Sequence, residues 1–319
     1  MTDLLTLIAV PMAAGGLQFP EMSPALVSID FGFIGLGTFH LRWYALAYIA
    51  GIMLAWQYAN ALIRRPDMFG GKAPATKEDL DDIMFWIILG IILGGRIGYV
   101  LFYMVPYQQD VIAANPMSVL KIWDGGMSFH GGLIGVTLAI LMIARRRQLD
   151  LLPLGDIAGV VAPIGIMFGR LANFINAELF GRKTDSAFGM VFPEGYVPGS
   201  TPPAYDWAAR QWVYSGQEFA RHPSQLYEAA LEGLLPLVVL SILIWKFDAL
   251  KKHGLVAGLF LLMYGAGRSI VENFRLPDSF ASDLPFGLTM GIILSTPMWI
   301  GGAWLVWNAL RPKPLHKPD

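Results

Sequence analysis

The sequence predicts an all-α, polytopic integral membrane protein with about seven transmembrane helices and an extracytoplasmic cap. Two properties of the composition favour this fold class. Hydrophobic residues make up 55% of the 319 positions and charged residues only 15%, and the mean hydropathy is +0.51. Soluble domains are usually less apolar and more charged. The arrangement is the third observation, because the apolar residues are gathered in long runs.

A helix that crosses the hydrocarbon core needs about 20 mostly apolar residues. Stretches that satisfy or approach this length are 43–63, 83–104, 128–144, 151–173, 225–245, 255–274 and 287–309. They define a predicted transmembrane domain over residues 43–309. It lies between an N-terminal surface arm at 1–42 and a tail at 310–319.

The arm is interpreted as a surface segment, because its apolar run from Leu4 to Gly16 is short and interrupted by Pro and Gly. It also lacks the basic start of a signal peptide. Lys and Arg concentrate in the loops that would be cytoplasmic if the N-terminus lay outside. The positive-inside rule therefore predicts an external N-terminus and a cytoplasmic C-terminal tail.

The longest predicted loop covers about residues 174–224 and is rich in Pro, Gly and aromatic residues. Loops of this length are usually functional or disordered. Its aromatic content favours a folded structure, so we interpret this loop as a small cap outside the membrane.

Composition also argues against several classes of function. A net charge of −1 and the lack of any basic tract longer than Arg145–Arg147 argue against a nucleic-acid partner. The sequence contains no Cys, which excludes disulfides, thiolate metal sites and a Cys nucleophile of its own. The five His residues are scattered without metal-ligand spacing. We expect neither a metal nor a cofactor.

Three arginines, Arg96, Arg170 and Arg268, lie within the predicted spans. An Arg at the centre of a spanning helix costs about 2.5–3.5 kcal/mol on insertion scales. Ionisable residues inside a membrane are therefore functional candidates by default.

The segment Gly169–Gly181 brings polar residues to the end of an apolar run. On a continuous helix Arg170 and Asn173 share a face, and Glu178 returns to nearly the same side two turns later. One interpretation is a site for an anionic group at the membrane surface. The alternative is a buried Arg–Glu pair that locks two helices together. We prefer the site.

A second candidate, His130, is bracketed by Gly-Gly pairs in the segment that precedes and opens the third span. The glycines leave room for a ligand beside the ring. An ordinary imidazole pKa of about 6.5 suits a proton acceptor near neutrality. A structural histidine at the edge of a helix is the alternative.

The segment that follows the long loop begins His222-Pro223, and Pro suits the first turn of a helix. Gln225, Glu228 and Glu232 then line one face of that helix. Buried carboxylates need partners, which Arg96 or Arg268 could supply. A structural role is preferred to a catalytic one for this group.

The sixth span carries Tyr264, Arg268, Glu272 and Arg275 on a single stripe. Glu272 could pair with either arginine and leave the other free for an anion. In the first span, Tyr44 either belongs to an interfacial aromatic belt or points inward as a hydroxyl donor.

Together these segments resemble the bacterial prolipoprotein diacylglyceryl transferase family. Gly169–Gly181 is similar to that family's signature in its Gly-Arg, Asn-Phe, Asn, Glu and final Gly. The stretches 124–132, 222–228 and 268–278 resemble further blocks of the family in the expected order. The resemblance covers about residues 43–308. The arm before about residue 35 lies outside it, and the loop 182–221 is too variable to compare.

The resemblance implies transfer of diacylglyceryl from phosphatidylglycerol to the lipobox cysteine thiol of a prolipoprotein, in the bacterial inner membrane. A thioether forms and glycerol phosphate leaves, so the substrate supplies the thiol that this chain lacks. Arg170 and Arg268 would hold the phosphate, and His130 would serve as or support the base. The implied substrate-binding residues are Arg170, Tyr44, Asn173, Glu178, Gly181, Tyr264 and Glu272. The implied partners are phosphatidylglycerol, the lipobox peptide and the bilayer.

The competing hypothesis is a lipid or organic-anion transporter that binds its ligand with the membrane arginines. Transporters often contain related halves, whereas the Gly169–Gly181 and Arg268 segments are not similar. The large polar loop also favours an enzyme that admits a protein segment. A purely structural membrane protein would leave the three arginines unexplained.

Overall fold

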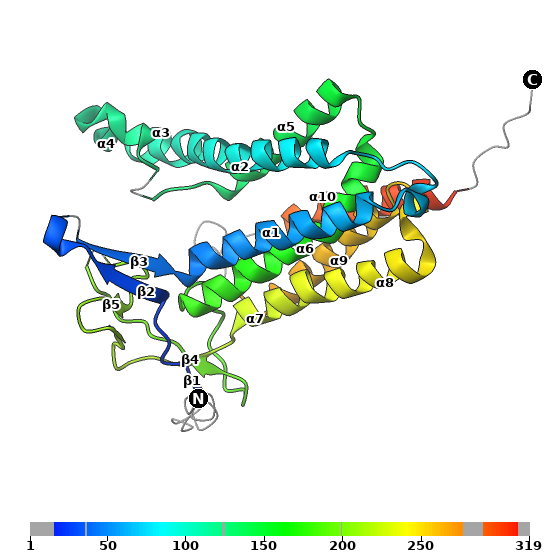
Figure 1. The fold of residues 1–319 in the computed structure, drawn as a ribbon. Helices are drawn as coiled ribbons and strands as arrows, with labels where there is room; N and C mark the ends of the chain where they lie inside the picture. The colour runs from blue at the N-terminus through cyan, green and yellow to red at the C-terminus, as the bar shows by residue number, and fades with distance from the viewer. Residues whose placement is uncertain (1–15, 36, 123–124, 199, 277–289, 312–319) are drawn as a thin grey trace, which may run out of the picture. The chain divides into compact units, whose positions relative to one another are not determined.

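The computed structural model describes residues 16–35, 37–122, 125–198, 200–276 and 290–311. Helices dominate it (Figure 1). The chain forms two compact units, of which the first contains residues 1–55 and 158–319 and the second contains residues 56–157. Each unit is described by itself.

The predicted apolar stretches coincide with helices over most of their described length. These helices are α1 (Trp43–Ile63), α2 (Lys77–Tyr99), α5 (Phe129–Arg147), α6 (Leu151–Ile175), α7 (Ser224–Glu228), α8 (Leu235–Phe247), α9 (Leu255–Val271) and α10 (Met290–Leu310). Residues 287–289 of the last predicted span, the arm 1–15, residues 123–124, residues 277–278 and the tail from 312 lie outside the described residues.

Among the described residues, four helices are long and apolar enough to cross a membrane: Trp43–Ile63, Lys77–Tyr107, Leu151–Ile175 and Ser224–Phe247. The helix Leu255–Val271 is apolar but shorter. The predicted class, an all-α polytopic membrane protein, is confirmed.

Two of these spans pass through π-helical segments. Helix α2 continues through η4 (Val100–Met104) into α3 (Val105–Tyr107), and α7 continues through η7 (Ala229–Leu234) into α8. A π segment inserts a residue into the helical ladder and is frequent at functional sites. In the second case it lies directly after Glu228 and contains Glu232.

In the second unit, α2 and α5 pack with their backbones close together. A Cβ atom at Gly94 would lie 2.4 Å from the Gly131 carbonyl oxygen, and one at Gly135 would lie 2.0 Å from that of Gly90. Only glycine permits this approach. The unit also contains η3 (Pro66–Phe69), α4 (Gln109–Ala114) and η5 (Pro116–Leu120).

Short strands of the first unit lie outside the helices. Strands β1 (Leu17–Gln18), β4 (Met190–Val191) and β7 (Ala220–Arg221) form one sheet in the order β1-β4-β7. Strands β2 (Ala25–Asp30) and β3 (Thr38–Arg42) form an antiparallel hairpin, and β5 (Tyr205–Asp206) pairs with β6 (Gln211–Trp212). We call the described residues of 16–42 and 176–223 the strand region.

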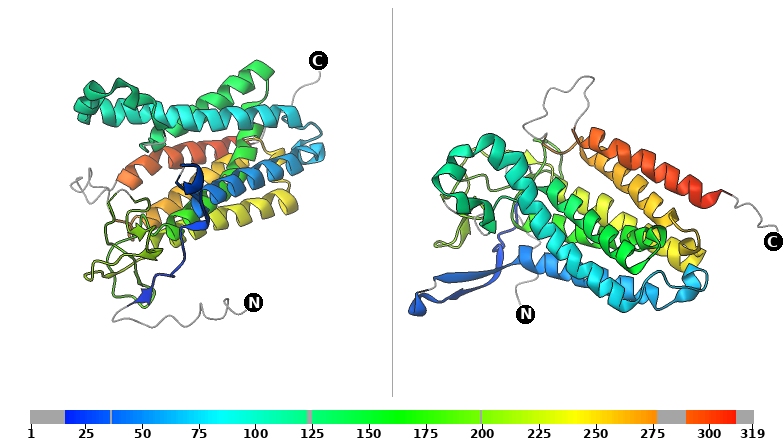
Figure 2. Two further views of the ribbon diagram at one scale, coloured as in Figure 1. Left: turned by 60° about the vertical axis from the view of Figure 1, so that its left-hand side comes forward. Right: turned by 90° about the horizontal axis from the view of Figure 1, so that it is seen from above.

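The strand region has a core of its own, formed by Phe19, Ala177, Met190, Phe192, Ala204, Tyr205 and Trp212. The Phe19 ring contacts the rings of Phe174, Phe192 and Trp212. Residues from the predicted arm and from the predicted cap therefore share one aromatic core. The hairpin β2–β3 projects beyond the start of α1, as the right-hand view of Figure 2 shows.

Candidate functional site

The site is built at the point where α6 ends. The helix stops at Ile175, and both Ala177 (φ 50°) and Leu179 (φ 59°) adopt left-handed backbone conformations. Glu178 therefore lies on a turn and not on the helical face shared by Arg170 and Asn173, so that part of the prediction is wrong. The turn still brings the two groups together, because the Asn173 Nδ2 donates to Glu178 Oε1 at 2.8 Å.

The start of α7 is fastened to this turn by two side chains. The Ser224 hydroxyl donates to the Leu179 carbonyl at 3.1 Å, and Gln225 Nε2 donates to the Glu178 carbonyl at 2.7 Å. Both side chains are fully buried. They give partners to two carbonyls of the turn that follows α6. Helices α6 and α7 are therefore held in a fixed register.

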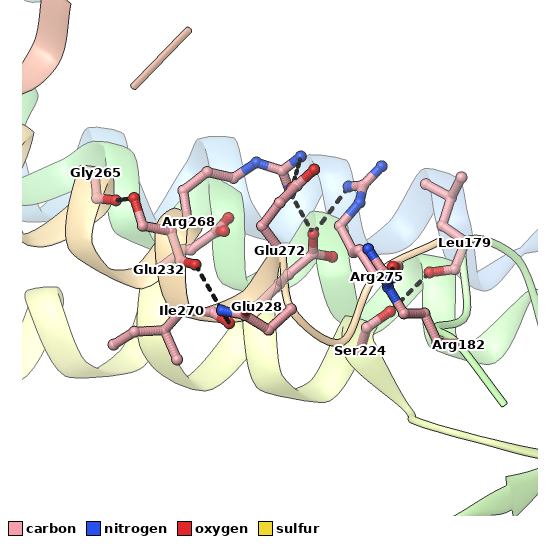
Figure 3. Close-up of polar contacts among 12 residues, drawn as sticks. Leu179, Arg182, Ser224, Glu228, Glu232, Gly265, Arg268, Ile270, Glu272 and Arg275 are labelled. Atoms are coloured by element: carbon pink, nitrogen blue, oxygen red, sulfur yellow. Dashed lines mark hydrogen bonds and ion pairs between the residues drawn. The ribbon is translucent and has the colours of Figure 1, made fainter. Parts of the chain in front are cut away.

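Three arginines converge on one carboxylate, that of Glu228. Its Oε1 lies 3.1 Å from Arg268 Nη1 and 3.0 Å from Arg275 Nη1, and its Oε2 lies 3.3 Å from Arg170 Nε. Figure 3 shows Arg268 and Arg275 directed toward Glu228. The contacts join α6, α7 and the C-terminal end of α9.

Two further carboxylates complete the group, which we call the arginine cluster: Arg170, Glu228, Glu232, Arg268, Glu272 and Arg275. Glu272 Oε2 lies 2.9 Å from Arg268 Nη2, and Glu232 Oε2 lies 3.9 Å from Arg170 Nη2. The sequence left open which arginine pairs with Glu272, and the structure shows that it is Arg268. The other arginine, Arg275, was then expected to be free for an anion, but it is paired with Glu228.

The cluster exposes its positive groups and buries its negative ones. The Arg170 side chain is 21% exposed and that of Arg268 is 14% exposed, whereas Glu228 and Glu232 are 0% exposed. An incoming anion therefore has access to the arginine side chains and not to these two carboxylates. The arrangement thus combines helix-locking ion pairs with a potential anion site, the two alternatives that the sequence left open.

Two other predicted site residues, Tyr44 and Tyr264, lie in the same unit as the cluster. The Tyr44 hydroxyl lies 3.3 Å from that of Tyr48 and near the Asn173 side chain. Tyr264 lies one turn before Arg268 on α9, near Glu232 and Arg170. These positions agree with an inward-pointing Tyr44, the second of the two orientations considered for it.

Gly181 lies where no side chain can be accommodated. Its N–H donates to the His222 carbonyl at 2.8 Å. A Cβ atom here would lie 2.3 Å from the Phe274 carbonyl oxygen and 2.9 Å from that of His222. The glycine allows the turn after α6 to lie against the segments that precede α7 and follow α9.

Burial shifts the pKa values of two groups that lie outside the helices, Glu178 and His222. Burial raises the pKa of the Glu178 carboxyl, and hydrogen bonds from Asn173 and Asn176 oppose this shift without cancelling it. Burial also lowers the pKa of His222. Both groups therefore favour their neutral forms more than they would in water.

His130 and Arg96 belong to the second unit. His130 is exposed at the start of α5, where Ser128 caps the helix by accepting from the Gly131 N–H at 3.2 Å. The structure places it in a different unit from the arginine cluster.

Arg96 does not pair with the carboxylates that were predicted as its partners. Its guanidinium donates to four backbone carbonyls, those of Ser118, Val119, Gly125 and Gly126, at 2.5–3.0 Å. These bonds hold the chain that leads into α5. Of the two arginines considered as partners for these carboxylates, Arg268 is the one that pairs with Glu228.

Sequence reasoning missed the central position of Glu228 and Glu232, which it regarded as structural. The available signal was their spacing with Gln225 on one helical face, next to a Pro that starts the helix. No group of three or more His, Asp or Glu side chains within the described part of the chain is placed to hold a metal ion.

Comparison with known proteins identifies relatives of the chain. The family model described as prolipoprotein diacylglyceryl transferase matches residues 32–308. A Caulobacter vibrioides protein named phosphatidylglycerol–prolipoprotein diacylglyceryl transferase is 47% identical over 92% of this chain and 95% of its own length. Proteins of the same name from Agrobacterium fabrum (44%; 95% and 98%) and Bradyrhizobium diazoefficiens (43%; 94% and 97%) are also similar. The chain belongs to the prolipoprotein diacylglyceryl transferase family.

Proposed function

We propose that this protein transfers the diacylglyceryl group of phosphatidylglycerol to the thiol of a lipobox cysteine in a prolipoprotein. The donor and acceptor are those in the names of its relatives. The observation that carries the proposal is the arginine cluster, in which partly exposed arginine side chains pair with fully buried carboxylates. Such a site suits an anionic phosphate at a membrane.

The proposed step is a displacement at carbon. The substrate thiol gives up its proton, and the thiolate attacks the glycerol carbon that carries the phosphate ester. The C–S bond forms as the C–O bond breaks, and glycerol phosphate leaves with the electron pair. Arg170 and Arg268 stabilise the charge that grows on the leaving phosphate. The nucleophile comes from the substrate, because this chain contains no Cys.

The remaining roles follow from this step. His130 receives the thiol proton or assists the group that does. Nearby cations lower the pKa of a thiol, so the guanidinium groups favour the thiolate as well. Tyr44, Asn173, Glu178, Gly181, Tyr264 and Glu272 shape the lipid site, and Glu228 positions the three arginines that contact it.

The proposed setting is the cytoplasmic membrane of a bacterium, with the N-terminus outside and the C-terminal tail 310–319 in the cytoplasm. The strand region would then form the predicted cap on the outer surface, where a secreted polypeptide arrives. The distribution of Lys and Arg among the loops supports this orientation.

Reconstitution tests the proposal. The purified protein is incubated with phosphatidylglycerol vesicles and a lipobox peptide, and the peptide is analysed by mass spectrometry. An increase by one diacylglyceryl unit is expected. Movement of lipid without modification of the peptide would instead identify a transporter and contradict the proposal.

Isotopic labelling tests which bond breaks. Heavy oxygen is placed in the bridge between the diacylglyceryl carbon and phosphorus. Attack at carbon sends all of the label out with glycerol phosphate, whereas label retained on the diacylglyceryl group would show attack at phosphorus.

A further inference from the structure

A groove of about 1130 Å³ lies within the strand region, between the hairpin β2–β3 and the strands β5–β6. One wall is the face of the hairpin that carries the cross-strand pairs Ser28–His40 and Asp30–Thr38. The opposite wall includes Tyr205, Trp207 and Trp212. All of these residues belong to the first unit, which also contains the arginine cluster.

Stacking and hydrogen bonds fix the positions of the groove walls. The His40 ring stacks on Trp207 with centroids 3.9 Å apart, and Ser28 Oγ lies 2.8 Å from His40 Nδ1. On the opposite side, the Trp212 Nε1 donates to the Met22 carbonyl at 2.9 Å. These contacts connect the hairpin to the aromatic core and hold the groove open between them.

The two faces of the hairpin differ in chemistry. Ser28, Asp30, Thr38 and His40 face the groove, whereas the pair Ile29–Phe39 lies on the other face. Acyl chains do not match a wall of hydroxyl, carboxylate and imidazole groups. A polar wall opposite an aromatic wall instead matches a polypeptide, whose backbone is polar and whose side chains can stack.

Strand β2 supplies five of its six residues to the lining of this groove: Ala25, Leu26, Val27, Ser28 and Asp30. It pairs with β3 alone, so its other edge has no partner strand in the described residues. Consecutive residues from Ala25 to Ser28 line the groove, which therefore reaches the strand edge as well as one face. An unpaired edge is a ready template for an added strand.

The groove also lies at the end of the unit where a membrane-embedded substrate would leave the cluster. Strand β3 runs directly into α1 at Trp43, and Tyr44 in the first turn of α1 lies near Asn173 at the end of α6. A chain that brings its thiol to the cluster must continue from this end. The part of a signal peptide before its cleavage site is apolar, so the part after the cysteine is the better chemical match.

We propose that the residues following the acceptor cysteine bind in this groove as an extended strand paired to the free edge of β2. The inference rests on the proposed function, because it takes the acceptor to be a polypeptide. Strand β2 has six residues, so about five or six residues of the substrate, at about 3.3 Å each, would cover it.

The first test compares two acceptor peptides in the transfer assay with the full-length protein. One carries about eight residues after the cysteine, enough to run the length of β2, and the other ends directly after the cysteine. The longer peptide is expected to have a KM about tenfold lower. Equal KM values for the two peptides would overturn the proposal that the groove binds the acceptor. Transfer to neither peptide would refute the proposed function itself.

A matched pair of variants separates the groove from general damage to the hairpin. Thr38→Trp fills the groove, whereas Phe39→Trp changes the neighbouring residue on the opposite face, which is 55% exposed. Thr38→Trp is expected to remove the advantage of the longer peptide without altering KM for the short peptide or for phosphatidylglycerol. Phe39→Trp is expected to leave unchanged the advantage of the longer peptide and the KM values for the short peptide and for phosphatidylglycerol. The same response from both variants would contradict the assignment.

Backbone pairing is tested with methylated peptides and does not depend on a protein variant. N-methyl groups are placed on alternate amides after the cysteine, in two complementary sets. Only one set is expected to weaken binding, because alternate residues of an added strand direct their N–H groups toward the edge. Equal effects from the two sets would rule out strand addition.

Discussion

The arginine cluster and the Arg96 site are two regions that bury arginines within predicted spans and use them differently. Arg96 is 8% exposed and donates its N–H groups to four backbone carbonyls. Arg170 and Arg268 pair with buried carboxylates and retain 21% and 14% of their side-chain exposure. Arg96 is bound to backbone carbonyls and nearly buried, whereas Arg170 and Arg268 are bound to carboxylates and stay partly exposed. The acceptor chemistry, and not the presence of arginine, distinguishes the two sites.

The variant with the largest expected effect, Arg170→Lys, tests the difference between the two sites most directly. Arg170→Lys keeps the charge but removes the planar fork that grips phosphate oxygens. We expect kcat/KM to fall by about 10²–10³, as when one donor to a developing anion is removed, while the protein still inserts and folds. Turnover is measured with phosphatidylglycerol and a lipobox peptide. Near-normal turnover would show that charge alone suffices.

Arg96→Lys is the matched variant in the other region. It removes most of the bonds to the loop before α5, so we expect a lower thermal stability and a loss of activity that follows the folded fraction. If the correctly folded Arg96 variant lost as much turnover as Arg170→Lys, the distinction between the two sites would fail.

Glu228→Gln is expected to have the next largest effect, because one carboxylate is shared by three arginines. Removing one partner of a buried ion pair costs about 3–5 kcal/mol. We expect a lower melting temperature in detergent and weaker phosphatidylglycerol binding. Glu194→Gln is the control, since Glu194 pairs with Arg221 at a more exposed position. Equal losses in the two variants would argue against Glu228 as the centre of the cluster.

His130→Gln tests whether the second unit contributes to the chemistry. If His130 acts as the base, the rate is expected to fall by about 10²-fold with little change in lipid affinity. The deficit is expected to shrink as the pH rises toward about 8.5, the ordinary thiol pKa, since the substrate then ionises without help. A pH-independent deficit would assign His130 a positioning role.

The smallest effect concerns His222, which lies between Gly181 and Phe274. Burial lowers its pKa in the folded protein, so the unfolded chain binds the proton more readily. Its contribution to stability is present above pH 6.5 and is lost as the pH falls through 6.5 toward the folded pKa. The drop in melting temperature between pH 7.5 and 5.5 is expected to be smaller in His222→Gln. An unchanged drop would show that His222 does not contribute.

The sequence predicted much of the site through single positions whose chemistry conflicts with a membrane. Arg170 and Arg268 were identified because arginine is costly there, and Gly181 because it belongs to a signature of the family. Helical spacing, which is a local property, limited the partners of Glu272 to Arg268 and Arg275, and the structure selects Arg268. The position of Glu178 did not follow, because the helix ends at Ile175 and the residues on either side of Glu178, Ala177 and Leu179, adopt left-handed conformations. The sequence contained no signal for this turn, because Ala and Leu rarely adopt left-handed conformations.

The sequence by itself determined the fold class, the approximate helix boundaries and the family, since hydrophobic length, helical period and motif residues are local. Only the tertiary structure decided which charges meet. Arg170, Glu228 and Arg275 come from three separate segments, and their convergence depends on how α6, α7 and α9 pack. The same holds for Arg96, whose acceptors lie more than twenty residues away along the chain. Ion pairs act over a few ångströms, and side-chain packing fixes distances on that scale.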